Sequence, residues 1–386
     1  MSLARRLAAL SDGGYTQAMD SSRRDVLKLL ACTAAVCPFL DATRVFGQAG
    51  APVKALFFED AGEKRVKCKL CPRECVVADM ERGYCGVREN RGGTYYTLVH
   101  SRPCLLNNDP IEKKPLFHFR PGTKAFSLAT AGCNIECRFC QNWEISQFRP
   151  EQVESREIPP AEIVRMAQRS GSPNIAFTYS EPTVFYEYMR DICDAAADTG
   201  LGRIVITNGF IQEKPLLELL PRVDAIKVDF KSFSETFYKE TCSGHLKPVL
   251  DSLVRIKEHG LWLELVMLVV PTLNDGENEH KAMARWIMQK LGPDVPVHFT
   301  RFHPMYKIQN LPPTPIATLE RAREIALDAG IHYAYAGNVP GHPGENTYCP
   351  VCKKMLIERD AYVIVQNVIK GGRCPYCNAA IAGVWG

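Results

Sequence analysis

The sequence has no large excess of charge of either sign. Its 386 residues carry a formal net charge of only +4, and lysine and arginine form no basic stripe along the chain. A basic patch is the electrostatic signature of nucleic-acid binding, so this composition argues against a nucleic-acid partner. A zinc-finger binding module is disfavoured for the same reason.

Long hydrophobic runs, low-complexity segments and fixed-period repeats are also missing. An apolar stretch near the N-terminus, from Leu29 to Leu40, is too short to cross a bilayer comfortably. We therefore expect no stable membrane span. A hydrophobic content of 46% with 23% charged residues is typical of a soluble globular enzyme, and the length suits one large domain or two modest ones.

Cysteine, in contrast, is abundant. Of the 16 cysteines, 14 lie beyond residue 49, and eleven of those fall in three tight clusters. Clustering of this kind favours metal ligation over a disulfide framework. Cys104, Cys193 and Cys242 stand alone in the sequence, and we expect them to be small buried residues rather than ligands.

The central cluster is a triplet, Cys133-x3-Cys137-x2-Cys140, with Phe139 directly before its last cysteine. Three thiolates at this spacing can each hold one iron of a [4Fe–4S] cluster and leave the fourth iron without a protein ligand. A structural zinc site, or a set of free cysteines, would suit a shorter and symmetric C-x2-C pair better. The triplet therefore predicts an iron–sulfur cluster with one open iron, and Phe139 beside it is a candidate cofactor-binding residue.

Runs around and far from the triplet give a more specific indication. They are Asp109 to Phe119 upstream, Gln141 to Gln147 beside the triplet, and Gly337 to His342 and Gly344 to Cys349 downstream. Together with the triplet they resemble the radical S-adenosylmethionine (SAM) member of the AmmeMemoRadiSam system, which is itself similar to pyruvate formate-lyase activating enzymes. The resemblance covers about residues 55 to 386, and the triplet alone marks only the superfamily.

The resemblance implies that the open iron chelates SAM. Reductive cleavage of SAM would then give methionine and a 5′-deoxyadenosyl radical, which removes a hydrogen atom from a substrate that the sequence does not name. It also implies a low-potential electron donor of the flavodoxin or ferredoxin type, with Memo-like and AMMECR-like proteins as partners. Two alternatives stay open, an activase of a glycyl-radical enzyme and a non-catalytic carrier with several Fe–S centres. The carrier predicts four cysteines per cluster, whereas this cluster has three.

Short apolar segments alternate with amphipathic ones after residue 120. The expected strands are residues 125–129, 174–178, 203–207, 225–229, 261–270 and 297–302. The expected helices are residues 160–170, 184–199, 215–220, 249–258 and 279–291. Such a repeat predicts an α/β fold with a parallel sheet, curled by right-handed crossovers into a partial (β/α)6 TIM-like barrel. A full eight-fold barrel is the alternative, because residues 331–336 have the pattern of a seventh strand.

Active sites of α/β barrels gather at the C-terminal ends of the strands. There, Tyr179-Ser180-Glu181 stands where the superfamily usually has a Gly-Gly-Glu run that meets the amino group of SAM. The resemblance thus makes Glu181 a candidate partner of that group, although the missing glycines put the backbone contacts in question. The alternative for Glu181 is a helix N-terminal residue stabilised by the helix dipole.

Two later strand ends add polar candidates. By the same resemblance, Asn208 and Asp229 are candidates for contacts with the ribose and carboxylate of SAM. Alternation along the strand places Lys227, Asp229 and Lys231 on its interior face, so a structural ion pair between Asp229 and Lys231 is the alternative. His298, with Arg301 and His303, is a weaker candidate for the same face, and a core histidine is the alternative there.

Two further cysteine quartets flank the repeat. Cys349, Cys352, Cys374 and Cys377 form two C-x2-C pairs 21 residues apart, which is close to the spacing of a zinc ribbon. We expect structural zinc there, with an auxiliary iron–sulfur cluster as the alternative. Cys68, Cys71, Cys75 and Cys85 supply four soft ligands that suit zinc or an iron–sulfur cluster alike.

The sequence thus divides into four parts. Residues 1–49 are a leader, 50–120 hold the N-terminal quartet and a lead-in, 121–336 form the radical SAM core, and 337–386 form the zinc-ribbon-like module. In the leader, Arg23-Arg24 precedes the apolar stretch and Gly47-Gln48-Ala49 offers small residues for cleavage, as in a twin-arginine export signal. A disordered extension is the alternative. We expect export from the cytoplasm, although SAM and low-potential electrons are cytoplasmic.

The first prediction tests the leader. Replacing Arg23→Lys together with Arg24→Lys should block export in the native host, because both arginines form the recognised pair. Cell fractionation should find the wild-type protein shortened and outside the cytoplasm, and the double variant full-length inside it. Full-length cytoplasmic protein in both strains would show that the leader is not an export signal.

Overall fold

The computed structural model describes residues 52–385, and the twin-arginine interpretation of residues 1–49 lies outside this range. Residues 51–386 form one compact unit. None of the helices in the described part is long and apolar enough to cross a membrane.

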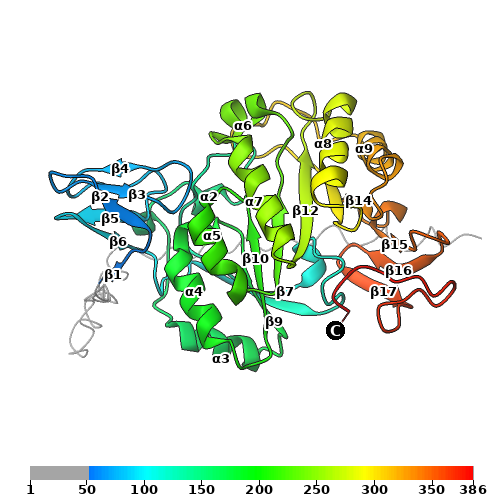
Figure 1. The fold of residues 1–386 in the computed structure, drawn as a ribbon, viewed down its shortest axis with the longest axis horizontal. Helices are drawn as coiled ribbons and strands as arrows, with labels where there is room; N and C mark the ends of the chain where they lie inside the picture. The colour runs from blue at the N-terminus through cyan, green and yellow to red at the C-terminus, as the bar shows by residue number, and fades with distance from the viewer. Residues whose placement is uncertain (1–51, 386) are drawn as a thin grey trace, which may run out of the picture. The chain divides into compact units, whose positions relative to one another are not determined.

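A mixed sheet of eight strands forms the centre of this unit, as Figure 1 shows. Its spatial order is β14-β13-β12-β11-β10-β9-β8-β7, with β8 to β14 parallel and β7 antiparallel to β8. The strands are β7 (Leu105–Pro110), β8 (Lys124–Ala129), β9 (Asn174–Phe177), β10 (Gly202–Thr207), β11 (Ala225–Asp229), β12 (Trp262–Val269), β13 (Val297–Arg301) and β14 (Ala334–Gly337). Within residues 52–385 the two edge strands, β7 and β14, are not paired with each other, so the barrel stays open.

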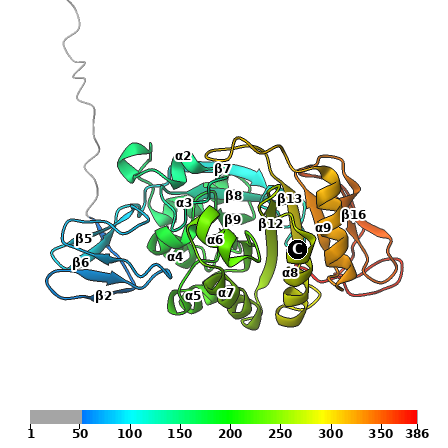
Figure 2. The ribbon, with the colours of Figure 1, turned by 90° about the horizontal axis from the view of Figure 1, so that it is seen from above.

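Helices in the crossovers cover the outer face of the curved sheet (Figures 1 and 2). They are α3 (Pro160–Arg169), α4 (Tyr186–Ala195), α5 (Glu213–Leu219), α6 (Glu235–Cys242), α7 (Leu246–Glu258), α8 (Glu277–Lys290) and α9 (Ile316–Asp328). Shorter pieces are α2 (Trp143–Ser146) and the 3-10 turns η1 (Ile111–Lys113), η2 (Pro150–Gln152), η3 (Pro182–Phe185), η4 (Leu220–Arg222) and η5 (Pro343–Glu345). The apolar sides of the helices pack against the strands and form one large core with them. Burial of these apolar faces is the usual reason why helices cover a sheet.

The expected α/β fold with a parallel sheet is confirmed. Each of the six expected strands is present with ends shifted by one residue at most, and β14 supplies the seventh strand that the alternative proposed. The sheet therefore has seven parallel strands rather than six. Strand β7 was not expected, because its run of Asn107, Asn108 and Asp109 is polar and two of those side chains are exposed.

The N-terminal module consists of two small antiparallel sheets. One contains β1 (Val53–Lys54), β6 (Thr94–Thr97) and β5 (Arg88–Arg91), and the other β2 (Phe58–Asp60), β3 (Val66–Cys68) and β4 (Val76–Val77). Buried Arg88 forms an ion pair with buried Glu187 of α4, and the backbone N–H of Leu56 donates to the same carboxylate at 2.7 Å. Because a buried charge without a partner is strongly destabilising, this pair ties the module to the barrel.

A third small sheet, formed by β15 (Thr347–Tyr348), β16 (Met355–Asp360) and β17 (Val363–Asn367), closes the chain. It packs on the segment that holds Phe117 and His118. Arg359 of β16 donates to the carbonyl oxygen of Phe117 at 2.9 Å, and the Nδ1–H of His118 donates to the carbonyl oxygen of Ala382 at 2.7 Å. From the other side, buried Glu264 of β12 accepts the backbone N–H groups of Phe117 at 3.0 Å and His118 at 2.9 Å.

The second prediction concerns His118 and pH. Burial lowers its pKa from 6.5 to about 4, so between these values the unfolded chain holds a proton that the folded chain does not. The free energy of unfolding should therefore fall as pH falls through this window, by up to about 3 kcal/mol. The free energy of unfolding, measured by urea titration between pH 7 and pH 4, should depend less on pH in His118→Gln than in wild type. A control, His259→Gln at the exposed surface, should keep the wild-type slope; equal slopes in all three proteins would contradict the assignment.

Candidate functional site

A cavity of about 440 Å³ opens at the C-terminal ends of the parallel strands. This volume lies within the usual range for small-ligand sites. The cavity is lined by all seven residues expected to bind the cluster or SAM: Cys133, Cys137, Phe139, Cys140, Glu181, Asn208 and Asp229. They lie in the loops after β8, β9 and β10 and at the last residue of β11, so only the fold brings them together.

The cysteine triplet lies in the loop that follows β8. Within residues 52–385, three or more possible metal-ligand atoms of His, Cys, Asp or Glu come within 4.8 Å of one another at one place only, which is the C-terminal quartet. At least two of the sulfurs of Cys133, Cys137 and Cys140 therefore lie more than 4.8 Å apart, which is farther than the about 3.8 Å between sulfurs that share one zinc ion. Three separated thiols at the wall of a cavity fit the donor set of a [4Fe–4S] cluster better than that of a zinc ion.

Gly132 shapes the start of this loop. Its φ is +99°, a conformation that side chains other than hydrogen rarely adopt. An added Cβ would lie 2.6 Å from Cγ1 of Val87 and 2.9 Å from the carbonyl oxygen of Cys85. The cluster loop thus packs directly against the N-terminal module.

Glu181 is buried at the bottom of the cavity and is held by four hydrogen bonds. Its Oε1 accepts the backbone N–H of Thr183 at 3.0 Å and the hydroxyls of Thr183 and Thr207 at 2.7 and 2.6 Å, and its Oε2 accepts the backbone N–H of Asn208 at 2.8 Å. Burial raises the pKa of Glu181, and these hydrogen bonds oppose the rise. The carboxylate caps η3, as the structural alternative proposed, and it also faces the cavity.

Tyr179 occupies the first position of the segment that replaces Gly-Gly-Glu. Its φ of +66° is left-handed, which is unusual for a bulky residue and normal for glycine. The side chain is held by Asp109, which accepts its hydroxyl hydrogen, and the carbonyl oxygen accepts from Nδ2 of Asn142 at 2.9 Å. The backbone therefore keeps a glycine-like conformation although the glycine is absent, and contacts on both sides of the residue stabilise it.

Asn208 connects the end of β10 to the cluster loop. Its Nδ2 donates to Oδ1 of Asn134 at 2.9 Å and lies 3.9 Å from the sulfur of Cys133. Asn134 in turn donates to the carbonyl oxygen of Phe210 at 2.7 Å. This chain of amides positions the residue next to the first cysteine.

Asp229 lies between two lysines on the interior face of β11 and the residues after it. Lys227 forms an ion pair with one carboxylate oxygen, and Nζ of Lys231 lies 3.0 Å from the other. Burial would raise the pKa of Asp229, but the two lysines outweigh it and lower the pKa. The ion pair of Asp229 with Lys231, expected as the alternative, is present, and all three side chains also line the cavity.

Several residues near the cavity were not expected from the sequence. Lys114 is buried beside Asp109 at 2.6 Å, and burial lowers its pKa to about 8. Cys242, interpreted as an isolated buried cysteine, contacts the cluster loop: its carbonyl oxygen accepts from the N–H of Glu136 at 2.9 Å. No sequence signal points to this contact, because Cys242 and the triplet are far apart along the chain.

His298 does not belong to the site. Its Nε2 lies 2.8 Å from a carboxylate oxygen of Glu264, and its ring packs edge-on against Phe117 at 4.7 Å. The interpretation of His298 as part of a substrate face is therefore wrong, and the core alternative is correct. A second cavity, of about 830 Å³, lies between α9 and the C-terminal module, and none of the triplet cysteines lines it.

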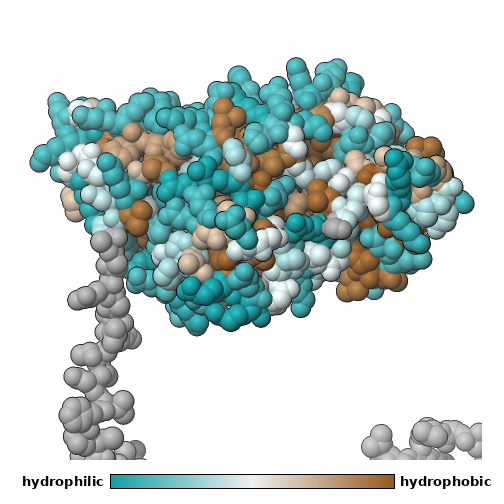
Figure 3. Space-filling model, turned by 60° about the horizontal axis from the view of Figure 1, so that its bottom comes forward, coloured by the Kyte–Doolittle hydropathy of each residue, from teal (hydrophilic) through white to brown (hydrophobic). Residues whose placement is uncertain are grey.

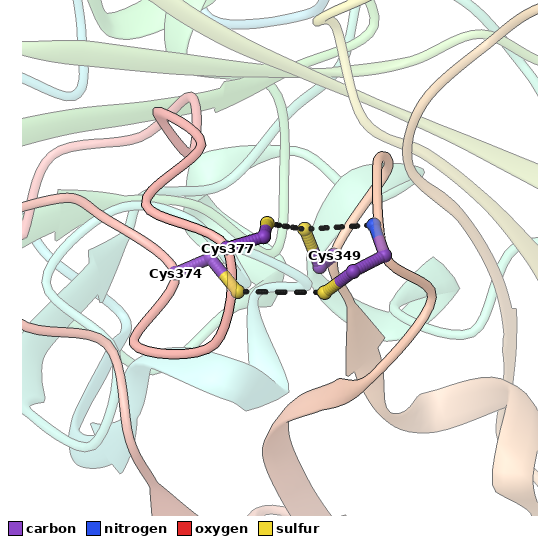
Figure 4. Close-up of side chains that lie close together, drawn as sticks. Cys349, Cys374 and Cys377 are labelled. Carbon is purple, nitrogen blue, oxygen red and sulfur yellow. Dashed lines mark hydrogen bonds between the residues drawn. The ribbon is translucent and has the colours of Figure 1, made fainter.

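The four cysteines of the C-terminal quartet face one another across two loops (Figure 4). The sulfurs of Cys349 and Cys377 are 3.6 Å apart, and those of Cys352 and Cys374 are 3.7 Å apart. Four thiolates bound to one ion at about 2.3 Å in a tetrahedron would have their sulfurs about 3.8 Å apart. The quartet thus has the geometry of a single-ion site.

The core of this module is small: Leu356, Ile357 and Ile381 are buried against Phe117, Tyr333 and Tyr335. Four of the five side chains of β17 are exposed, with Val363 and Val365 exposed by 64% and 60%. Figure 3 shows hydrophobic groups interspersed with hydrophilic ones on the face that it presents. A unit with so small a core depends on additional cross-links for its stability.

Comparison with known proteins gives the family of the chain. The radical SAM superfamily matches residues 127–284. The uncharacterized protein MJ0808 of Methanocaldococcus jannaschii is 46% identical over 330 residues, which are 85% of this chain and 98% of the relative. A putative glycyl-radical enzyme activating enzyme of the same organism, MJ1632, is 24% identical over 212 residues, 52% of this chain and 76% of the relative.

A solved domain of a pyruvate-formate lyase-activating enzyme from Bacteroides vulgatus covers 42% of this chain and 98% of its own, with 18% identity and a TM-score of 0.38. The chain belongs to the same family as MJ0808, and its residues 127–284 match the radical SAM superfamily.

The third prediction tests the packing of the cluster loop. Gly132→Ala should lower the free energy of unfolding by about 3 kcal/mol, because strain at positive φ adds to overpacking against Val87 and Cys85. Gly260→Ala is a matched control, with a φ of +85° and nothing within 4 Å of the added Cβ, and should lower it by about 1 kcal/mol. Equal losses in urea titrations of the two variants would contradict the close contact.

Proposed function

We propose that this radical SAM protein is an enzyme that binds a [4Fe–4S] cluster through Cys133, Cys137 and Cys140 and SAM in the adjoining cavity. The observation that carries the proposal is that three separated thiols and the polar residues Glu181, Asn208 and Asp229 line one cavity at the barrel's functional end. When bound, the cluster and SAM supply reductive cleavage to methionine and a 5′-deoxyadenosyl radical, which abstracts hydrogen from a substrate.

The residues of the chain would hold SAM by its charged groups. Within the described part of the chain, Oε2 of Glu181 accepts one hydrogen bond, so a lone pair is left for the ammonium group of SAM. Lys227 and Lys231 together exceed Asp229 by one positive charge, which suits a ligand carboxylate. The buried walls around them keep water from the reacting groups and strengthen these charge interactions.

A second candidate is an activase that abstracts hydrogen from a glycine of a partner enzyme. It is favoured by the similarity to the putative glycyl-radical enzyme activating enzyme of M. jannaschii. Such an enzyme needs a protein substrate that inserts a glycine loop into the cavity. Formation of a glycyl radical signal by electron paramagnetic resonance, in a partner protein mixed with the enzyme, SAM and dithionite, would distinguish it from an enzyme of small-molecule substrates.

For the C-terminal quartet we propose structural zinc. The spacing of its sulfurs, 3.6 and 3.7 Å, supports a single tetrahedral ion rather than a cluster. All four positions are taken by cysteine, so no open position is left for catalysis. Zinc would cross-link the two loops that hold this small sheet together.

Three further parts of the proposal rest on the resemblance and the leader alone. They are the low-potential electron donor, the membership of the AmmeMemoRadiSam system with its Memo-like and AMMECR-like partners, and export by the twin-arginine route. They stay predictions.

The fourth prediction tests the cluster triplet. Cys133→Ala, Cys137→Ala and Cys140→Ala should each reduce 5′-deoxyadenosine formation to background after anaerobic reconstitution with iron and sulfide, because each cysteine supplies a ligand with no substitute. Product would be measured by chromatography after addition of SAM and dithionite. Cys104→Ser, outside the cavity lining, is the control and should retain wild-type product formation. SAM cleavage with an intact cluster in any of the three alanine variants would refute the assignment.

The fifth prediction tests zinc in the C-terminal quartet. Cys374→Ser with Cys377→Ser should release about one zinc per chain and lower Tm by about 5 °C or more, because the ion links two loops of a sheet with little core. Zinc would be measured by mass spectrometry and Tm by calorimetry. Redox-active iron at this quartet in protein purified without air would overturn the zinc assignment.

A further inference from the structure

The N-terminal quartet forms a second site, separate from the triplet. Cys68 ends β3, Cys71 and Cys75 lie in the turns that follow, and Cys85 precedes β5. All four line one cavity of about 20 Å³, which also includes Arg88 and Tyr95. So small a space excludes an organic cofactor, yet it has room for a body the size of a water molecule. Four sulfurs in contact around a zinc ion would leave no such room between them.

The spacing of the four sulfurs points the same way. Among the described residues, only the C-terminal quartet brings three or more possible ligand atoms within 4.8 Å of one another. No three sulfurs of the N-terminal quartet are that close, and in this respect the quartet is like the triplet of the radical SAM site. The two cysteine quartets of this chain therefore differ in geometry. The C-terminal quartet is closed to the size of a single ion, and the N-terminal quartet is wider.

Two buried polar groups in this cavity lack a partner. The hydroxyl of Tyr95 and Nε of Arg88 have no hydrogen-bond partner among the described residues, although the two side chains are 0% and 1% exposed. Nη1 of Arg88 lies 3.7 Å from the sulfur of Cys68, and the backbone N–H of Tyr84 lies 3.5 Å from the sulfur of Cys75. Buried donors are nearly always satisfied in proteins, so the hydroxyl and Nε indicate an acceptor that occupies the cavity.

We propose that Cys68, Cys71, Cys75 and Cys85 ligate an auxiliary [4Fe–4S] cluster whose sulfur atoms accept hydrogen bonds from Tyr95 and Arg88. Such a cluster offers inorganic sulfides as acceptors at its corners, which a zinc ion enclosed by four thiolates does not. Four cysteines complete all four irons, so this cluster has no open iron and does not bind SAM.

The site shares a wall with the radical SAM cavity. Asn134 lines the quartet cavity, and the residue before it, Cys133, lines the SAM cavity. The carbonyl oxygen of Cys85 also borders Gly132 in the cluster loop. The auxiliary cluster would therefore lie directly beside the loop that carries the first one.

Metal analysis of the full chain separates the two sites. A variant with Cys133→Ala, Cys137→Ala and Cys140→Ala, reconstituted without air, should retain about four iron and four sulfide per chain. Adding Cys71→Ala and Cys85→Ala should remove them, whereas adding Cys104→Ser should not. A triplet variant that holds a second zinc ion or no metal at all, or that keeps its iron without Cys71 and Cys85, would overturn the proposal.

The wild-type protein gives an independent count if the variants do not fold. Mössbauer spectroscopy with chemical analysis should find about eight iron per chain, against about four if only the triplet holds a cluster. The iron count does not depend on activity. If the triplet holds no cluster but the N-terminal quartet does, the protein with an intact triplet should contain about four iron, and Cys71→Ala with Cys85→Ala should remove all of them.

Tyr95→Phe tests the hydrogen bond itself, since it removes only a hydroxyl that has no partner among residues 52–385. The midpoint potential of the auxiliary cluster should become more negative in this variant, because a hydrogen bond to sulfur favours the reduced state. It is measured in the triplet variant by redox titration. Tyr96→Phe, a neighbouring tyrosine outside the cavity lining, should leave the potential unchanged; an unchanged potential in Tyr95→Phe would refute the contact.

Discussion

The buried carboxylate of Glu181 is the contact on which the arrangement of the site depends. It joins the turn after β9 to the end of β10, because it accepts from Thr183 on one side and from Thr207 and Asn208 on the other. Asn208 then fixes Asn134 in the cysteine loop. Burial of a carboxylate is unfavourable unless hydrogen bonds compensate for it, and here those hydrogen bonds are the ones that set the positions of the cavity walls.

The cysteines of this chain form three clusters, and the distances between their sulfurs differ. The C-terminal quartet closes to sulfur distances of 3.6 and 3.7 Å, which suit a single ion. The triplet and the N-terminal quartet stay wider, and each lines a cavity. Ligand identity is the same in all three, so loop geometry rather than residue type determines which metal group fits.

The N-terminal and C-terminal modules both contact the barrel close to the site. The N-terminal module is held by the buried pair of Arg88 and Glu187 and presses on Gly132 at the cluster loop. The C-terminal module holds Phe117 through Arg359, and its Tyr362 lines the cavity. A change in either module would therefore be transmitted to the site through contacts rather than through the chain. Tyr179 shows the same dependence, since its left-handed backbone is kept by Asp109 and Asn142.

The sequence by itself determined the strands and most helices of the barrel, because alternation of apolar segments depends on local periodicity. It also identified the triplet, since ligand spacing within one loop is local. It did not reveal β7, whose polar residues hide a strand, nor the hydrogen bond between Cys242 and the cluster loop, nor Lys114 beside Asp109. It also left open whether His298 lies in the core or on the cavity face. Only the tertiary structure decided these points, because burial and contacts arise where segments distant in the chain pack together.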